Sequence, residues 1–182
     1  WISPIATQKS GKAFFSPINN KSELPNFINS IKKDKKGFLW IGSTTGIYRY
    51  DGLQATIFKH NPTDSTGLST NQISKIFLDR SDNIWATTND HLLYFFDPKV
   101  ERFKRLPLFF KNKKKEKGRK IKIKTLIEDS HGIIWVATAN HGLNTLNPAT
   151  GKLSHIDLSD YFPHDYEMIY DLLEDQSGNI WG

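Results

Sequence analysis

Two short polar stretches contain side chains that suit ligand recognition. One holds Asn89 and His91, and the other holds Asn140 and His141. Amide and imidazole groups both donate and accept hydrogen bonds, which is what a hydroxyl-rich ligand such as an oligosaccharide requires. Asn and His also tolerate the left-handed dihedral angles of tight turns, so a purely structural role is the alternative.

A basic run is the second feature that suits a ligand. Nine Lys and Arg residues and one acid, Glu116, lie between Lys111 and Lys124, so the net charge of +6 belongs to one loop and the strand that follows it. Most such runs are solvated loops, and the functional alternative is a patch for an anionic glycan. Nucleic acid is not predicted, because bases need stacking aromatic residues beside the charge. The candidate residues are Lys113, Lys114, Lys115, Lys117 and Arg119.

No catalytic motif is found in the sequence. There is no cysteine and no His-Glu-x-x-His, and residues 42–46 lack the lysine of a phosphate-binding loop. The acid pairs Glu128-Asp129 and Glu174-Asp175 recur at equivalent places, which favours turn residues over catalytic carboxylates. We therefore expect no catalytic residue, no metal site and no cofactor in this segment.

The candidate residues lie within a repeat. Tryptophans recur at intervals of 45, 50 and 46 residues, each preceded six residues earlier by Asp. A repeat of 40 to 50 residues is typical of repeat architectures. The four tryptophans are Trp40, Trp85, Trp135 and Trp181, and their equivalent positions predict that all four belong to the core.

Each repeat predicts four short antiparallel strands. An apolar run ends at the Asp of a hairpin turn, the Trp strand follows, and two further strands are separated by pairs such as Asp97-Pro98. Four strands in about 45 residues predict a blade of an all-β, β-propeller fold. The chain then holds about three full blades and half of another.

The repeat also predicts the boundaries along the chain. The predicted segments are an irregular N-terminal segment at 1–23 and a propeller at 24–182, with blades at 24–59, 71–106 and 120–158, a basic insertion at 107–119 and a half blade at 165–182. A half blade leaves an open sheet edge. We expect the natural sequence to continue beyond Gly182, and the alternative is a ring of four blades closed by the N-terminal segment.

The strand order places the candidates on one face. In a four-stranded antiparallel blade, the turn between the second and third strands and the connector between blades emerge together. Asn89, His91, Asn140, His141 and the basic insertion therefore share a face, and convergent loops at one mouth of a β fold are a plausible ligand site.

The repeat resembles the two-component regulator propeller repeat. The resemblance rests on the pattern Ile-x-x-Asp-x-x-Gly-x-Ile-Trp-x-x-Thr-x-x-x-Gly-Leu, seen at 127–143 with shifts of one residue, and on Gly37-Phe38-Leu39-Trp40-Ile41-Gly42 and Gly46-Ile47-Tyr48-Arg49-Tyr50-Asp51-Gly52. It covers roughly residues 24–182. Leu92 replaces the glycine found at Gly142, and Asp82 replaces the turn glycine, so the hairpins of the second blade are less certain than the fold.

The resemblance implies a sensor. In that family the repeats form the periplasmic part of membrane-bound regulators, often hybrid histidine kinases of Bacteroidetes that detect polysaccharide fragments. It implies an extracytoplasmic segment without enzyme activity, in a membrane-anchored parent with a cytoplasmic kinase and transcription output. An oligosaccharide ligand and self-association or packing with further blades are expected. A protein-interaction propeller and a propeller-type lyase or glycan-active enzyme are the alternatives.

Overall fold

The computed structural model describes residues 5–9, 12–16, 24–25, 27–106, 122–139, 142–156, 158 and 169–182. Within these ranges the regular elements are all β-strands, which confirms the predicted all-β class. The same ranges contain no helix of the length and apolar character needed to cross a membrane.

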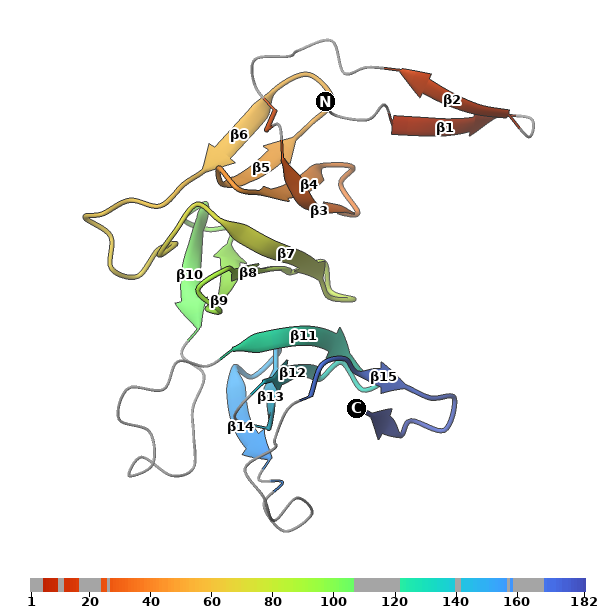
Figure 1. Ribbon diagram of the computed structural model, residues 1–182, viewed down its shortest axis with the longest axis vertical. Helices are drawn as coiled ribbons and strands as arrows, with labels where there is room; N and C mark the ends of the chain where they lie inside the picture. Colours follow the sequence, from red (N-terminus) through yellow and green to blue (C-terminus); the bar gives the residue numbers. More distant parts are fainter. Residues whose placement is uncertain are drawn as a thin grey trace.

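Three four-stranded antiparallel sheets form the body of the molecule (Figure 1). Within each sheet the strands pair in chain order, as in a propeller blade. Sheet 1 contains β3 (Ile28–Lys33), β4 (Leu39–Ser43), β5 (Ile47–Tyr50) and β6 (Ala55–Phe58); sheet 2 contains β7 (Ile73–Leu78), β8 (Ile84–Thr88), β9 (Leu93–Asp97) and β10 (Arg102–Leu106); sheet 3 contains β11 (Ile123–Glu128), β12 (Ile134–Thr138), β13 (Leu143–Asn147) and β14 (Lys152–Ile156). The three sheets lie within the three predicted blades.

Two hairpins lie at opposite ends of the stack of sheets (Figure 1). One pairs β15 (Leu173–Glu174) with β16 (Ile180–Trp181), and the other pairs β1 (Ile5–Lys9) with β2 (Lys12–Ser16). The β1–β2 hairpin lies within residues 1–23, for which the sequence analysis predicted an irregular segment. Its strands do not align with the repeat, although Ser10-Gly11 between them is a turn pair. The two hairpins do not pair with each other, so they do not close a ring of four blades.

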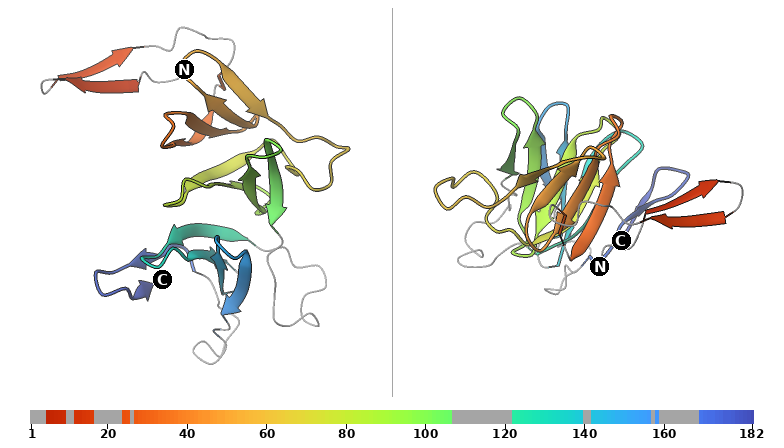
Figure 2. Two further views of the ribbon diagram at one scale, coloured as in Figure 1. Left: turned by 180° about the vertical axis from the view of Figure 1, so that it is seen from behind. Right: turned by 90° about the horizontal axis from the view of Figure 1, so that it is seen from above.

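The sheets pack face to face, as the view from above in Figure 2 shows. Trp40 of sheet 1 is 2% exposed and meets Phe96 of sheet 2 edge-on, with ring centroids 4.9 Å apart. Trp85 of sheet 2 packs with Ile123 and Leu126 of sheet 3 in the same way. Each tryptophan is therefore a large apolar wedge between its own sheet and the next.

One glycine permits this close approach. A Cβ atom at Gly42 would lie 2.9 Å from Cγ2 of Ile73 and 3.0 Å from Cγ1 of Ile76, both in sheet 2. The side chain of Ser30 also bonds to the edge of β7, accepting from the Ile76 N–H at 3.1 Å and donating to the Ile76 carbonyl at 3.3 Å. Sheets 1 and 2 are thus joined by packing and by hydrogen bonds.

An aspartate holds each tryptophan and its hairpin turn together. One carboxylate oxygen accepts from the backbone N–H four residues later, and the other accepts from the indole Nε1–H six residues later. We call this pair the Asp–Trp clamp. The Nε1–Oδ2 distances for Trp40–Asp34, Trp85–Asp79, Trp135–Asp129 and Trp181–Asp175 are 2.9, 3.0, 2.7 and 2.8 Å. The sequence predicted the turn role of the aspartates but not the indole bond.

The burial of the tryptophans falls along the chain. Trp40 and Trp85 are buried, whereas Trp135 is half-buried and Trp181 is 61% exposed. The prediction that all four belong to the core is therefore wrong for Trp181. The physical reason is that the next sheet covers the wedges of sheets 1 and 2, whereas the described residues form no further sheet after the β15–β16 hairpin.

A second set of hydrogen bonds links the Asp turns of successive sheets. In sheets 1, 2 and 3 the backbone N–H of the residue after the turn aspartate donates to a carboxylate of the next sheet or hairpin, and we call this set the turn ladder. Its bonds run from Lys35 N to Asp82 Oδ2 (3.0 Å), from Arg80 N to Glu128 Oε2 (2.6 Å) and from Ser130 N to Glu174 Oε1 (2.8 Å).

Asp82 explains why the second blade keeps its hairpin without a turn glycine. Its φ is 68°, in the left-handed region that the glycines of the other turns occupy, and Asp is among the residues that tolerate it. Sheet 2 has Leu78 where sheet 3 has Glu128, so Asp82 also supplies the ladder acceptor that Leu78 lacks.

Removing one clamp should destabilise the fold. We expect Asp79→Ala to lower the free energy of unfolding by about 3 kcal/mol, because the Trp85 indole and the Asn83 backbone N–H lose a charged acceptor in a buried site. Urea unfolding followed by tryptophan fluorescence measures this. Asp51→Ala, which removes an exposed turn aspartate that no tryptophan contacts, is the matched control and should cost less. Equal losses in the two variants would contradict the role of the clamp.

Acid should open the β15–β16 hairpin. Hydrogen bonds from the Trp181 indole and from Asn179 lower the pKa of Asp175 from 3.8 to about 2. A carboxyl group whose pKa is lower in the folded state stabilises the fold above its unfolded pKa and loses that effect as the pH falls through the folded value. We therefore expect protection of the hairpin amides from hydrogen exchange to fall between about pH 4 and pH 2. In Asp175→Asn this pH dependence should vanish, and its persistence would point to another group.

Candidate functional site

The structure describes two of the predicted site residues. Asn89 and His91 lie in the turn between β8 and β9, and the side chain of Asn89 is exposed. Asn140, His141 and the basic candidates Lys113, Lys114, Lys115, Lys117 and Arg119 lie outside the described residues.

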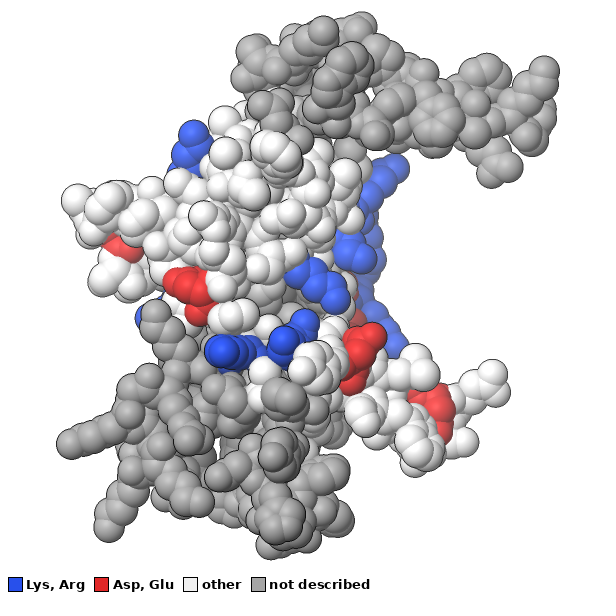
Figure 3. Space-filling view, in the orientation of Figure 1, with Lys and Arg blue, Asp and Glu red and all other residues white. Residues whose placement is uncertain are grey.

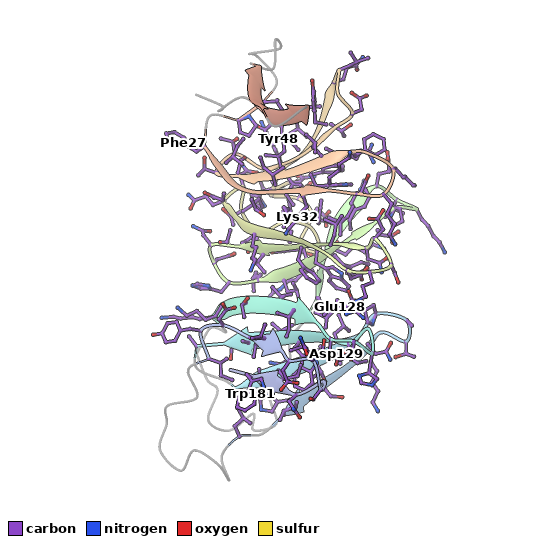
Figure 4. The ribbon with its side chains drawn as sticks, turned by 90° about the vertical axis from the view of Figure 1, so that its right-hand side faces the viewer. Phe27, Lys32, Tyr48, Glu128, Asp129 and Trp181 are labelled. Carbon is purple, nitrogen blue, oxygen red and sulfur yellow. The ribbon has the colours of Figure 1, made fainter. Side chains whose placement is uncertain are left out.

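The turns between the second and third strands share a face with the connectors, as predicted. The Asn89 N–H donates to the Gln72 carbonyl just before β7 at 3.0 Å, and the Ala139 N–H donates to the Lys122 carbonyl just before β11 at 2.8 Å. Figure 4 shows Phe27, at the start of β3, on one side of the stack, and Glu128 and Asp129 toward the other. We call the side of Phe27 and Asn89 the loop face and the side of Asp129 the turn face.

A polar network fixes the β8–β9 turn on the loop face. The carboxylate of Asp90 accepts from the hydroxyls of Ser69 and Thr88, at 2.6 and 2.5 Å. Ser69 in turn accepts from the hydroxyl of the buried Tyr94 at 2.9 Å, and its N–H donates to that hydroxyl at 3.0 Å. The network ties the connector, the turn and the core of sheet 2 into one unit. The sequence did not predict the hydrogen bond between Ser69 and Asp90, because the two residues are 21 positions apart.

The backbone dihedral angles distinguish a ligand-binding role from a purely structural role for Asn89 and His91. His91 has a φ of 66°, and Gly142 has a φ of 58° in the corresponding turn of sheet 3. Tolerance of the left-handed region therefore accounts for His91. Asn89 is not among the described residues with positive φ, so this tolerance does not account for it. Its amide bonds to the Gln72 side chain and remains exposed to solvent.

The loop face of sheet 2 carries three side chains that can donate or accept hydrogen bonds. Asn89 has an amide, Asp90 a carboxylate and His91 an imidazole, all in three consecutive residues that the network holds in place. These groups can pair with the hydroxyls of a sugar, which both donate and accept. Within the described residues, no group of three or more His, Asp or Glu side chains is arranged to hold a metal ion.

Basic side chains also gather along one edge of the stack (Figure 3). Exposed lysines lie on the inner strands, and Figure 4 shows Lys32 near the middle of this side. The sequence analysis assigned the net positive charge to the basic run. It did not predict this second group of lysines, because residues of different blades meet on one edge only in the folded structure. The exposed inner-strand lysines are Lys32, Lys33, Lys75 and Lys124.

The turn face has one groove between sheets 1 and 2, of about 410 Å³. Arg49 lies over the Phe38 ring at 5.4 Å and pairs with Glu101 at 3.0 Å. Trp40 lines the groove but is only 2% exposed, so it offers little surface for stacking. The groove is also lined by polar and charged side chains, among them Lys36, Ser81 and Asn83.

The sequence is similar to a family model and to one histidine kinase. Residues 22–45 match the family described as Two component regulator propeller. Histidine kinase P4 of Formosa agariphila is 36% identical over 67 residues, which are 36% of this chain and 5% of that protein.

Two solved structures share the fold. The extracellular domain assigned to the hybrid two component system BT3049 of B. thetaiotaomicron has a TM-score of 0.67 and 22% identity, over 86% of this chain and 22% of that chain. The extracellular domain assigned to the one component system BT4673 of the same organism has a TM-score of 0.61 and 22% identity, over 95% of this chain and 24% of that chain. This chain thus spans less than a quarter of either domain.

The matched segment contains the first Asp–Trp clamp, which recurs in sheets 2 and 3 and in the β15–β16 hairpin. The family match thus covers one copy of a unit that recurs along the described chain.

Proposed function

We propose that the chain is part of the extracytoplasmic, ligand-sensing propeller of a two-component signal-transduction regulator. The observation that carries the proposal is the family match at residues 22–45, in a fold shared with extracellular domains of B. thetaiotaomicron. The chain has no catalytic role in this proposal. Kinase chemistry belongs to another part of a membrane-anchored parent, as the similarity to a histidine kinase suggests.

The proposed ligand is an oligosaccharide bound at the loop face. Asn89, Asp90 and His91 supply fixed donors and acceptors there. Asn140 and His141 occupy the matching stretch of the third repeat in the sequence, so they are proposed to contribute in the same way. If the ligand is anionic, the basic run from Lys113 to Arg119 would add long-range attraction.

Signal transmission in this proposal is a rigid-body movement. Sheets 1 and 2 share a core around Trp40 and are linked by the Ser30 hydroxyl and the turn ladder. Packed cores resist continuous deformation, so ligand binding should move whole propellers or protomers against each other. Structures with and without bound oligosaccharide should superpose within each sheet, and a rearranged core around Trp40 would contradict this.

Loss of the turn side chains should weaken ligand binding without loss of the fold. We expect Asn89→Ala/His91→Gly to lower oligosaccharide binding on a glycan array at least about tenfold, because two hydrogen bonds of about 1 kcal/mol each are removed. Glycine accepts a φ of 66° readily, so the thermal stability of the variant should stay near that of the wild type.

Three outcomes separate the ligand hypotheses. Neutralising Lys113, Lys114, Lys115, Lys117 and Arg119 should reduce the binding of anionic glycans and leave neutral ones unchanged; equal binding of anionic glycans would remove the basic run from the site. No bound glycan, with capture of a protein instead, would favour a protein-interaction propeller. Cleavage of a bound glycan would favour the enzyme alternative.

A further inference from the structure

Two neighbouring side chains of sheet 3 have buried polar atoms without hydrogen-bond partners among the described residues. Asn144 of β13 is 0% exposed, and both its Nδ2 and its Oδ1 atoms are unpaired within this part of the chain. His155 lies directly opposite on β14 and is half-buried, and its Nδ1 atom is buried and unpaired in the same way. We call these two residues the polar pair. Buried polar groups without partners are rare in folded proteins, so the polar pair calls for an explanation.

The polar pair faces sheet 2 near the loop face. Directly opposite residues of an antiparallel sheet point to the same side. Asn144 lies opposite Val136, which packs in one core with Trp85 and Leu93 of sheet 2. β13 starts at the β12–β13 turn, which belongs to the loop face. Three hydrogen-bonding atoms therefore lie at the loop end of the apolar interface between the neighbouring sheets 2 and 3 (Figure 1).

The equivalent residue of the other two sheets is a tyrosine with a hydrogen-bonded hydroxyl. Tyr48 occupies the place in sheet 1, and its hydroxyl lies 3.0 Å from that of Thr45. Tyr94 occupies it in sheet 2, and its hydroxyl bonds to Ser69. Packing alone does not account for Asn144, because a ring or an aliphatic side chain would fill the same place without unpaired atoms.

The interface around the polar pair has fewer aromatic contacts than the one before it. Trp40 of sheet 1 meets Phe96 and Phe103 of sheet 2, with ring centroids 4.9 and 6.1 Å apart. In sheet 3, Leu146 and Leu153 take the places of these two rings. Sheet 3 thus cannot make the corresponding ring contacts with sheet 2.

The spacing of the two interfaces also differs. Thr87, which is buried, stands on β8 where β4 has Gly42. A Cβ atom at Gly42 would lie only 2.9 Å from Cγ2 of Ile73 in the next sheet. Sheets 2 and 3 therefore cannot approach at this place as closely as sheets 1 and 2 do.

The described hydrogen bonds between sheets 2 and 3 lie at the turn face and on the inner strands. Arg80 donates its backbone N–H to Glu128 at 2.6 Å and its guanidinium N–H to the Ser130 carbonyl at 3.0 Å. Lys75 of β7 reaches Thr125 of β11 at 3.5 Å. The two sheets can therefore separate at the loop end, where the polar pair lies, while the bonds at the turn face persist.

We infer that the polar pair is a binding subsite for one sugar unit of an oligosaccharide, which enters between sheets 2 and 3 from the loop face. The inference rests on the proposed function for the class of ligand. The Asn144 amide donates through Nδ2 and accepts through Oδ1, and His155 Nδ1 can do either, so the pair matches neighbouring hydroxyl groups. Binding gives partners to three atoms whose burial without partners costs stability, which offsets the cost of separating the sheets. Leu93 supplies apolar surface for the C–H groups of the sugar.

Thermal unfolding of the full chain tests whether the polar pair lacks partners. Leucine has the branching of asparagine without its polar atoms, so Asn144→Leu should keep the unfolding midpoint or raise it by up to about 3 °C. The smaller Asn144→Val covers the case in which leucine overfills the site. Tyr94→Phe is the matched control, because it removes hydrogen bonds that are made, and it should lower the midpoint by about 3 °C. A similar fall in both Asn144 variants would mean that a protein group or an ordered water already satisfies the amide, and the inference would be wrong.

A glycan array tests the subsite itself. Asn144→Leu should weaken the binding of the oligosaccharides that the wild type retains by at least about tenfold, because two hydrogen bonds are lost, and His155→Phe by about fivefold. Thr145→Val changes the next residue of β13, whose side chain points to the opposite face, and should bind like the wild type.

Two results on the array separate this inference from the proposed function. If Asn144→Leu binds as tightly as the wild type while Asn89→Ala/His91→Gly binds more weakly, the subsite is refuted and the loop-face ligand site stands. If the wild type retains no oligosaccharide, the proposed class of ligand is wrong and the subsite falls with it.

Discussion

The hydrogen bond from each indole to its turn aspartate is the interaction on which the other contacts depend. The bond fixes the ring over the face of its sheet and fixes the hairpin turn at the same time, since the same carboxylate holds a backbone N–H. A correctly placed ring can then act as the wedge that spaces one sheet from the next, as Trp40 does against Phe96. Local geometry within six residues thus sets the arrangement of whole sheets.

The sequence predicted the number and order of the sheets well, because the Asp–Trp clamp is formed within six residues and is repeated along the chain. The spacing of Trp40, Trp85 and Trp135 gave the number of sheets and the face of each turn. Contacts between sheets were harder to predict, since their residues are tens of positions apart and need not occupy the same place in each repeat. Asp82 and Glu128 accept equivalent ladder bonds from different positions, so an alignment on the tryptophans does not pair them.

The candidate site also combines local features that the sequence predicted with contacts between distant residues that it did not. Asn89 and His91 lie in one turn with Asn89 exposed, and the hydrogen bonds that fix this turn come from Ser69, Asp90 and Tyr94. A sensor benefits from such a division of labour. The hydrogen bonds of the network keep the turn in one shape, and the exposed Asn89 is free to differ between relatives that recognise different ligands.

The donor of every ladder bond is a main-chain N–H group, and this has an evolutionary consequence. Lys35, Arg80 and Ser130 are chemically unrelated, yet they make the same contact. Only the acceptor side constrains the residue type. A gene that duplicates or deletes one unit therefore keeps the ladder if the unit has an acid at either of the two acceptor positions, so arrays of this kind can change length over generations while their units diverge in many other respects.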